Sequence, residues 1–238
     1  ESPFWVIHLY MTNGALVQGV NIKAHGHNND GIDPEMSKNI LIQNCVFDQG
    51  DDAVAIKSGR NQEAWRLNSP SKNIVIRNCR IKEGHQLLAL GSELSSGIEN
   101  IYLHDCILEN EVNSKMNHIL FIKSNERRGG YVSNIYVKNL KVNSLKSALL
   151  GIDNDVLYQW KSLVPTLEKK YTKMNNIHLE NITVKKTPSI AKVFGNSKYK
   201  VKNIFMDSIK IESLTDRPWI IKNSEEVKTN SVIYNNQL

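Results

Sequence analysis

NIVIRNC, residues 73–79, recurs along the chain with the same alternation of apolar and polar residues. A degenerate copy, GALVQGV, starts at Gly14. The other copies are NILIQNC at 39–45, NIYLHDC at 100–106, NIYVKNL at 134–140, NIHLENI at 176–182 and NIFMDSI at 203–209. Their starts are separated by 25, 34, 27, 34, 42 and 27 residues. Repeats of this size are typical of solenoids, in which each repeat packs on its neighbours.

The alternation within each copy predicts a β-strand with one buried face, as for Ile74 and Ile76. A second short β-like run follows most copies, for example at 87–90, and then a polar stretch of variable length. Stacking such coils places equivalent strands about 4.8 Å apart around one continuous core. The sequence therefore predicts an all-β fold, a right-handed parallel β-helix of about seven coils, with residues 1–238 forming a single domain.

Two other arrangements of strands fit the sequence less well. A parallel sheet with crossover helices needs a helical pattern of roughly 10–15 residues between strands, and none persists. A β-sandwich needs hairpin turns between successive strands, but the pairs Asn13-Gly14 and Asp30-Gly31 do not recur.

Two polar positions and one cysteine position also repeat. The leading Asn of the motif, and an Asn or Asp five residues later, are expected to form side-chain ladders that satisfy backbone groups at the turns. Cys45, Cys79 and Cys106 share one motif position, so we expect a stack of small, buried, reduced residues. Without a Cys-x-x-Cys pair they give little support to a zinc site.

The composition limits the kinds of partner. A hydrophobic content of 40% is ample for a core, so disorder is excluded. The formal charge of +6 suits an acidic partner, either nucleic acid or an acidic polysaccharide, but no nucleic-acid-binding motif is present. No apolar run approaches the roughly 18 residues that cross a membrane. We therefore expect no nucleic acid and no membrane partner, and the oligomeric state stays open.

The repeat is interrupted at four places that bear chemically reactive side chains: Asn28 to Asp33, Gly50-Asp51-Asp52, Gly84-His85 and Ile122-Lys123. Each lies near a second strand-like run, so stacking would bring them to one lateral face. The 21 residues from Asp30 to Asp51 correspond to one coil.

Adjacent residues of a regular strand point to opposite faces, so Gly50 predicts a bend that turns both Asp51 and Asp52 outward. Repulsion among three carboxylates raises at least one pKa, which yields a proton donor beside ionised groups that activate water. Glycoside hydrolysis needs this pairing. Asp33, which precedes Pro34, is expected to be a turn residue.

These residues make the chain resemble glycoside hydrolase family 28, the polygalacturonases and their relatives. The family carries Asn-Thr-Asp, Gly/Gln-Asp-Asp, Gly-His-Gly and Arg-Ile-Lys motifs in this order. The corresponding stretches here are Asn28-Asn29-Asp30, Gly50-Asp51-Asp52, Gly84-His85-Gln86 and Phe121-Ile122-Lys123.

The resemblance implies a role for each matched residue. Asp51 would be the general acid, Asp30 and Asp52 would activate water, and the reaction would invert the anomeric centre. His85 would tune the acid or contact sugar. Asn28 and Lys123 would bind substrate, Lys123 through a uronate carboxylate.

The resemblance also bears on the surroundings of the site. The segment 58–71 resembles a loop that forms a wall of the cleft in bacterial members. Arg60 and Trp65 are therefore expected to contact substrate. The Trp65 ring would either stack on a sugar or shield the loop from solvent. The implied partner is an acidic pectic polysaccharide, with no cofactor and no metal. The implied location is secreted or periplasmic. Family members have further coils and a cap before the equivalent of Glu1, so an N-terminal part is expected to be missing.

The sequence departs from the family pattern at three places. Phe121 replaces an Arg that clamps a carboxylate, and Gln86 replaces the second Gly of the His motif. The family's downstream Tyr aligns with Val156, two residues before Tyr158. Loss of the Arg favours a neutral sugar at that subsite, so rhamnogalacturonan is a candidate beside polygalacturonan.

Two alternative functions remain open for a β-helix of this kind. A pectate-lyase-like enzyme would bind calcium through carboxylates and release an unsaturated, ultraviolet-absorbing sugar. A non-catalytic carbohydrate-binding β-helix would bind without turnover, and Asp51→Asn would leave its behaviour unchanged.

Overall fold

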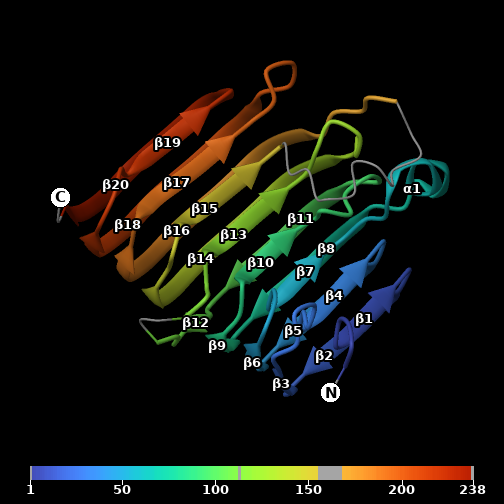
Figure 1. Cartoon of the computed structure of the whole chain (residues 1–238), viewed down its shortest axis with the longest axis horizontal. Helices are drawn as coiled ribbons and strands as arrows, with labels where there is room; N and C mark the ends of the chain where they lie inside the picture. Colours follow the sequence, from blue (N-terminus) through green and yellow to red (C-terminus); the bar gives the residue numbers. More distant parts are fainter. Residues whose placement is uncertain (1, 112–113, 155–167, 237–238) are drawn as a thin grey trace.

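The computed structural model describes residues 2–111, 114–154 and 168–236, which form two parallel sheets along the length of a solenoid (Figure 1). The predicted right-handed parallel β-helix is confirmed. The first sheet has eight strands in the order of the chain, one from each coil. They are β1 (Ile7–Tyr10), β4 (Ile32–Glu35), β7 (Val54–Ile56), β10 (Gln86–Leu90), β13 (His118–Lys123), β15 (Ala148–Asp153), β17 (Ser189–Phe194) and β19 (Trp219–Lys222).

The second sheet contains the repeated motif. In the first four coils two short strands follow one another, and in the last four they merge into one long strand. The short strands are β2 (Asn13–Gln18), β3 (Asn21–Ala24), β5 (Lys38–Gln43), β6 (Val46–Gln49), β8 (Ser71–Arg77), β9 (Arg80–Glu83), β11 (Ile98–His104) and β12 (Ile107–Leu108). The long strands are β14 (Tyr131–Ser144), β16 (Lys173–Thr187), β18 (Val201–Leu214) and β20 (Ser224–Asn236).

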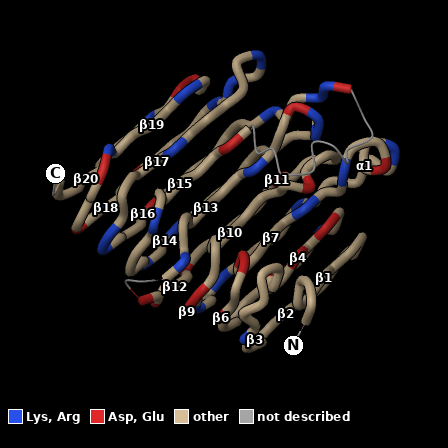
Figure 2. The backbone as a smooth tube through the Cα atoms, viewed as in Figure 1, with Lys and Arg blue, Asp and Glu red and all other residues tan. Residues whose placement is uncertain are grey.

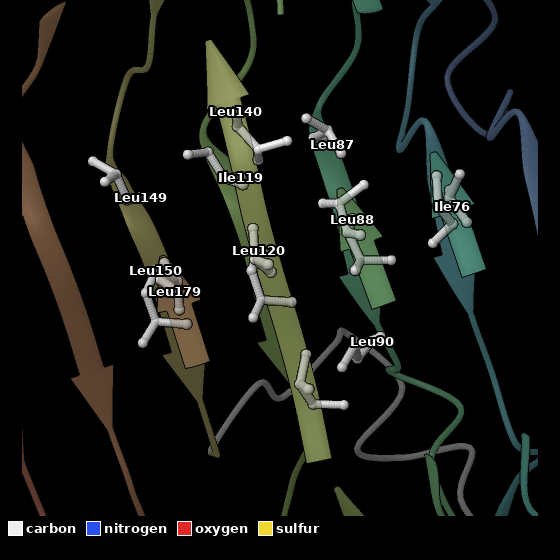
Figure 3. Close-up of a cluster of buried hydrophobic side chains, with 14 of the residues drawn as sticks. Ile76, Leu87, Leu88, Leu90, Ile119, Leu120, Leu140, Leu149, Leu150 and Leu179 are labelled. Carbon is white, nitrogen blue, oxygen red and sulfur yellow. The ribbon is translucent and has the colours of Figure 1, made fainter. Parts of the chain in front are cut away.

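The motif copies pair in register, which puts their apolar residues into one column. Ile74 lies opposite Ile40 on one side and Ile101 on the other, and the column continues through Ile135, Ile177 and Ile204. All six side chains are buried. Leucines and isoleucines of the first sheet fill the same interior (Figure 3). The core therefore consists of stacked identical layers, as the sequence repeat predicts.

The structure contains one more coil than the sequence predicts. Strand β20 continues the second sheet, and its Val227 pairs with Ile204 of the sixth motif copy. Glu226 takes the place of the leading Asn, with a positive φ of 57°. The copy escaped recognition because it lacks the leading Asn and because Lys228 and Thr229 replace two of the four apolar residues.

The repeated asparagines turn the chain at the corners of each coil. Asn73, Asn100 and Asn134 all have φ between 55° and 57°, a left-handed conformation that Asn tolerates better than most residues. Asn100 Nδ2 donates to Asn73 Oδ1 at 3.1 Å, and Asn134 Nδ2 donates to Asn100 Oδ1 at 3.0 Å. The predicted ladder is thus confirmed, although its rungs join amide to amide and not amide to backbone.

The three cysteines are free and buried, as predicted. The backbone N–H of Cys79 donates to Cys106 Sγ at 3.4 Å, and this neighbour together with burial raises the pKa of the Cys79 thiol to about 12. The Cys79 thiol therefore stays protonated at neutral pH, and all three cysteines act as packing residues.

The segment 58–71, predicted as a loop, contains the short helix α1 (Asn61–Leu67), which projects beside the first sheet (Figure 1). The helix ends where Asn68 adopts a left-handed φ of 46°. Ser95 Oγ accepts a hydrogen bond from the Asn61 N–H at 2.7 Å and so ties the helix to the loop after β10. Among the described residues no helix is long and apolar enough to cross a membrane.

Candidate active site

Three of the four sequence interruptions stack directly on one another just before strands of the first sheet. The Asp51 N–H donates to the Asn29 carbonyl at 3.4 Å, and the Gly31 N–H donates to the Asp52 carbonyl at 2.9 Å. On the other side, the His85 N–H donates to the Asp51 carbonyl at 2.9 Å. The backbone ladder of the solenoid therefore brings Asp30, Asp51, Asp52 and His85 together from three successive coils.

A bend at Gly50 separates β6 from β7, as predicted. A Cβ at this position would collide with the carbonyl of Gly26, so only glycine fits so close to the preceding coil. The bend is held by Gln49 Nε2, which donates to the Asp52 carbonyl at 2.6 Å, and by the Asp52 N–H, which donates to Asp51 Oδ1 at 2.9 Å. Both carboxylates consequently leave strand geometry and enter one cluster.

The acidic cluster, defined as Asp30, Asp51 and Asp52, is paired with two basic side chains. Lys123 Nζ lies 3.0 Å from Asp52 Oδ2, and His85 Nδ1 lies 3.7 Å from Asp51 Oδ1 and 4.0 Å from Asp52 Oδ1. Asp52 is fully buried, whereas the His85 side chain is 51% exposed. The cluster is therefore buried at Asp52 and open to solvent at its rim, where the His85 imidazole lies.

The electrostatic environment separates the carboxylates. Burial raises the pKa of Asp30 to about 7, with Lys57 opposing the shift and Asp52 and Asp51 adding to it. Burial also works to raise the pKa of Asp51, but His85 and Lys123 outweigh it, and the pKa lies below its usual value. Contact with Asp51 raises the pKa of His85. Asp51 and His85 therefore stabilise each other's charged forms, beside a carboxylate that titrates near 7.

Asp33 is not the turn residue that the sequence predicts. It lies within β4 and is fully buried, with Oδ1 3.5 Å from Lys57 Nζ. Burial raises its pKa to about 9 in spite of Lys57, and the carboxylates of Asp30 and Asp52 add to the shift. The following Pro34 does not end the strand: it lies opposite Leu9 of β1, and its carbonyl accepts from the Lys57 N–H at 2.9 Å. Asp33 is therefore a fourth carboxyl group behind the acidic cluster.

Sequence reasoning missed the buried ion network next to Asp33. Lys57 is 4% exposed, and Glu93, from the loop after β10, is 6% exposed. A Lys directly after the buried run Val-Ala-Ile is the available signal, since a Lys there must find carboxylates or leave the core. The partner Glu93 carries no such signal, because it lies in an irregular segment.

Asn28, which the sequence predicts to bind substrate, differs from its neighbour Asn29 in exposure. Asn28 is exposed, while its neighbour Asn29 is the buried amide, accepting from the Gly26 N–H and donating to the Ser2 and Phe4 carbonyls. Of the two asparagines in Asn28-Asn29-Asp30, Asn29 therefore stabilises the loop, and Asn28 alone is exposed to solvent.

Arg60 and Trp65 make structural contacts away from the acidic cluster. The Arg60 guanidinium is bound to Glu93 Oε1 at 2.5 Å and lines a cavity of 270 Å³ with Trp5 and Glu93. Trp65 Nε1 donates to the Arg128 carbonyl at 2.9 Å, and Lys170 Nζ lies 3.8 Å above the ring centroid. One face of Trp65 is thus covered by a cation, which favours the shielding role over sugar stacking.

The two departures at Gln86 and Phe121 belong to one arrangement. His118 stacks on Phe121 with centroids 4.7 Å apart and an interplanar angle of 7°, and its Nδ1 is hydrogen-bonded to Gln86 Oε1 at 2.8 Å. Gly151 lies opposite Phe121, where a Cβ would collide with both rings. Burial lowers the pKa of His118 to about 3, so the imidazole is neutral. Val156 and Tyr158 lie outside the described residues.

A metal ion has one possible set of ligands among the described residues: Asp51, Asp52 and His85 each offer an atom within 4.8 Å of the others. Calcium prefers six to eight oxygen ligands, and here an imidazole takes one place of three. The ammonium of Lys123 also lies 3.0 Å from Asp52 and repels a cation. This donor set does not fit the calcium site of a lyase.

Comparison with known proteins places this site in a recognised context. The model of the glycosyl hydrolases family 28 matches residues 1–232. A "Probable polygalacturonase" from Vitis vinifera is 36% identical over 151 residues, covering 62% of this chain and 30% of that protein. An endo-polygalacturonase from Pectobacterium carotovorum subsp. carotovorum is 30% identical over 198 residues, covering 82% of this chain and 43% of that protein.

A solved structure gives the same picture. The crystal structure of a hyperthermoactive exopolygalacturonase from Thermotoga maritima has a TM-score of 0.78 and 29% identity, over 88% of this chain and 45% of that one. The chain therefore spans less than half the length of these relatives.

Proposed function

The chain belongs to glycoside hydrolase family 28, and from this premise we propose that it hydrolyses α-linked, galacturonate-containing pectic polysaccharide with inversion at the anomeric carbon. The observation that carries the proposal is the convergence of Asp30, Asp51 and Asp52 with His85 and Lys123 on adjacent coils. Carboxyl groups clustered on adjacent coils supply the acid and the base that this reaction needs. The raised pKa belongs to Asp30 and the pKa of Asp51 is lowered, so in this proposal the proton of the acid has to reach Asp51 from His85.

We assign the proton transfers as follows. Asp51 protonates the departing glycosidic oxygen as the bond to the anomeric carbon breaks. Asp30 and Asp52 hold a water molecule on the opposite side and take its proton as the water oxygen bonds to that carbon. His85, next to Asp51 and with its raised pKa, holds the proton of this pair in the free protein and passes it to Asp51 when sugar excludes water from the rim.

The substrate proposal rests on two side chains of β13. Lys123, whose Nζ lies 3.0 Å from Asp52 Oδ2, offers a positive charge for a uronate carboxylate. Phe121 offers a flat apolar ring stacked on a neutral His118, which suits the face of an uncharged sugar. We therefore propose a galacturonate chain with a neutral sugar next to the cleaved bond, as in rhamnogalacturonan, with polygalacturonan as the weaker substrate. Such a polymer lies outside the cytoplasm, so we place the enzyme in the periplasm or outside the cell.

The variant Phe121→Arg tests the substrate assignment. Arg supplies a bidentate partner for a carboxylate, worth about 1.5–3 kcal/mol for a charged hydrogen bond, so kcat/KM on homogalacturonan is expected to rise about tenfold or more. The ratio of kcat/KM for homogalacturonan and rhamnogalacturonan is the measurement. Phe121→Leu is the control, since it removes the ring without adding charge. A homogalacturonan rate that is already high with Phe121 and falls with Arg would contradict the assignment.

The reaction class is tested by incubating the protein with homogalacturonan, rhamnogalacturonan and xylogalacturonan fragments and identifying the products. The proposal predicts saturated products with new reducing ends, whether or not a chelator is present. An unsaturated, ultraviolet-absorbing product would instead indicate a lyase. Binding to the same fragments without any product would indicate a carbohydrate-binding protein.

A further inference from the structure

Behind the acidic cluster lies a second network, defined as Lys57, Asp33, Glu93 and Arg60. The ammonium of Lys57 lies 3.4 Å from Glu93 Oε2, 3.5 Å from Asp33 Oδ1 and 3.7 Å from Asp30 Oδ2. These carboxyl groups come from β4 and from the segments flanking β4 and β10. Lys57 is thus shared by Asp30, which belongs to the acidic cluster, and by Asp33 and Glu93, which lie outside it.

The backbone fixes Lys57 in this position. Its N–H donates to the Pro34 carbonyl at 2.9 Å, and its carbonyl accepts from Ser71 Oγ at 2.6 Å. The ring of Trp5 covers the ammonium, with Nζ 4.3 Å from the ring centroid. Because water is largely excluded, the charge of Lys57 acts on its neighbours with little screening.

The network has a definite charge state. Glu93 is buried, yet Lys57 and Arg60 hold its pKa well below the usual range, so it is ionised. Burial would lower the pKa of Lys57, but Glu93, Asp33 and Asp30 hold it above the usual range, so it is protonated. Asp33, with a pKa of about 9, is a neutral acid around pH 7. Glu93 thus competes with Asp30 for the charge of Lys57, while Asp33 does not.

We propose that Lys57 is a positioning residue for the reaction, whose buried ammonium holds Asp30 in place as an ionised carboxylate while Glu93 limits how strongly it does so. This role rests on the proposed function, in which Asp30 accepts a proton from water. The titratable groups that face Asp30 are Lys57, Asp33, Asp51, Asp52 and Lys123. Two of these groups are cations, and Lys57 lowers the pKa of Asp30 more than Lys123 does.

Two substitutions with opposite expected effects test this role. Lys57→Met removes the cation at similar volume, and the pKa of Asp30 is expected to rise by about one pH unit or more, since a charge within about 4–6 Å shifts a pKa by this amount. Glu93→Gln removes the competing carboxylate, and the pKa of Asp30 is expected to fall. The matched control is Lys72→Met, at a half-exposed lysine of β8 outside both clusters, which should leave the pKa of Asp30 unchanged.

The pH profile of kcat/KM gives the first readout. Asp30 must be ionised to accept a proton, so activity is lost as the pH falls through its pKa. With a midpoint moved from about 7 to about 8, the ionised fraction at about pH 6 falls roughly tenfold, and so does activity relative to its plateau. Glu93→Gln is expected to retain more of its plateau activity at about pH 6 than the unaltered protein.

Carboxyl NMR titration of Asp30 gives a second readout that needs no substrate. If the titration midpoint moves in opposite directions in the two variants but the unaltered protein cleaves no pectin, the proposed function fails and the effect of Lys57 on Asp30 stands. If pectin is cleaved and the midpoint is the same in all folded variants, or moves in the same direction in both, the positioning role is wrong.

The double variant Lys57→Met/Glu93→Gln guards against misfolding of Lys57→Met, because it removes one charge of each sign from the buried network. Its Asp30 midpoint is expected to lie above that of Glu93→Gln. A midpoint equal to that of Glu93→Gln would show that Lys57 has no effect and would overturn the proposal.

Discussion

Asp51→Asn is expected to lower kcat for pectin hydrolysis by about 10²- to 10⁴-fold, the usual contribution of a positioned acid or base. The amide cannot give a proton to the departing oxygen. Its oxygen can still accept the hydrogen bond from the Asp52 N–H, so the bend after β6 should keep its shape. Rates of reducing-end release, measured beside the melting temperature of each protein, give the result.

Asp48→Asn is the matched control for this experiment. Asp48 lies on β6 of the same coil, where it pairs with His25 at 2.9 Å on the exposed surface. This variant should retain nearly full activity. If Asp51→Asn kept more than a tenth of the activity, Asp51 would not be the general acid.

Ile76→Ala is expected to lower the free energy of unfolding by about 2–5 kcal/mol, the usual loss for a large aliphatic side chain cut back in a core. Ile76, labelled in Figure 3, is 1% exposed. It lies opposite Ile42 and Leu103 of the adjacent coils. A cavity here disturbs two interfaces between coils, and nearest-neighbour contacts supply the stability of a solenoid. Urea denaturation followed by circular dichroism measures the change.

Ile107→Ala makes the same chemical change at a side chain of β12 that is 39% exposed. The loss of stability there should stay below about 1 kcal/mol, because little apolar area leaves the core. Equal losses at the two positions would contradict the layered core.

The fold was predictable because the same physical demand recurs in every coil. Each motif copy must bury two alternate side chains and turn a corner in a left-handed conformation, and Ile-x-Ile flanked by Asn meets both demands. The last coil shows the limit of this signal. At the end of the described stack the outer strand β20 is less buried, and it keeps Val227 and Val232 on the core while Thr229 and Glu226 replace an apolar residue and the leading Asn.

The site was predictable only in part. Asp30, Asp51, Asp52 and His85 interrupt the repeat, and in-register stacking brings them together. The network of Lys57 and Glu93 depends on a contact across 36 residues between irregular segments, which no spacing reveals. The charged positions along the chain gave no guide either, since Figure 2 shows acidic and basic positions interspersed from the N-terminal to the C-terminal coils.

The sequence indicates only two of the three residues in the arrangement of Gln86, His118 and Phe121. Gln86 and Phe121 were recognised as separate departures from the family motifs, but His118 joins them through a hydrogen bond and a ring stack. The in-register pairing of β10 with β13 sets Gln86 opposite His118. The register does not place Phe121 beside His118, because residues three apart in a regular strand point to opposite faces.

Inversion at the anomeric carbon tests the proposed function most directly. ¹H NMR spectra recorded within the first minutes of cleavage, before mutarotation, identify the anomer of the new reducing end. Asp51 as acid, with Asp30 and Asp52 holding water, predicts that the α-linked substrate yields the β-anomer first. Initial appearance of the α-anomer would show retention and would contradict the assignment.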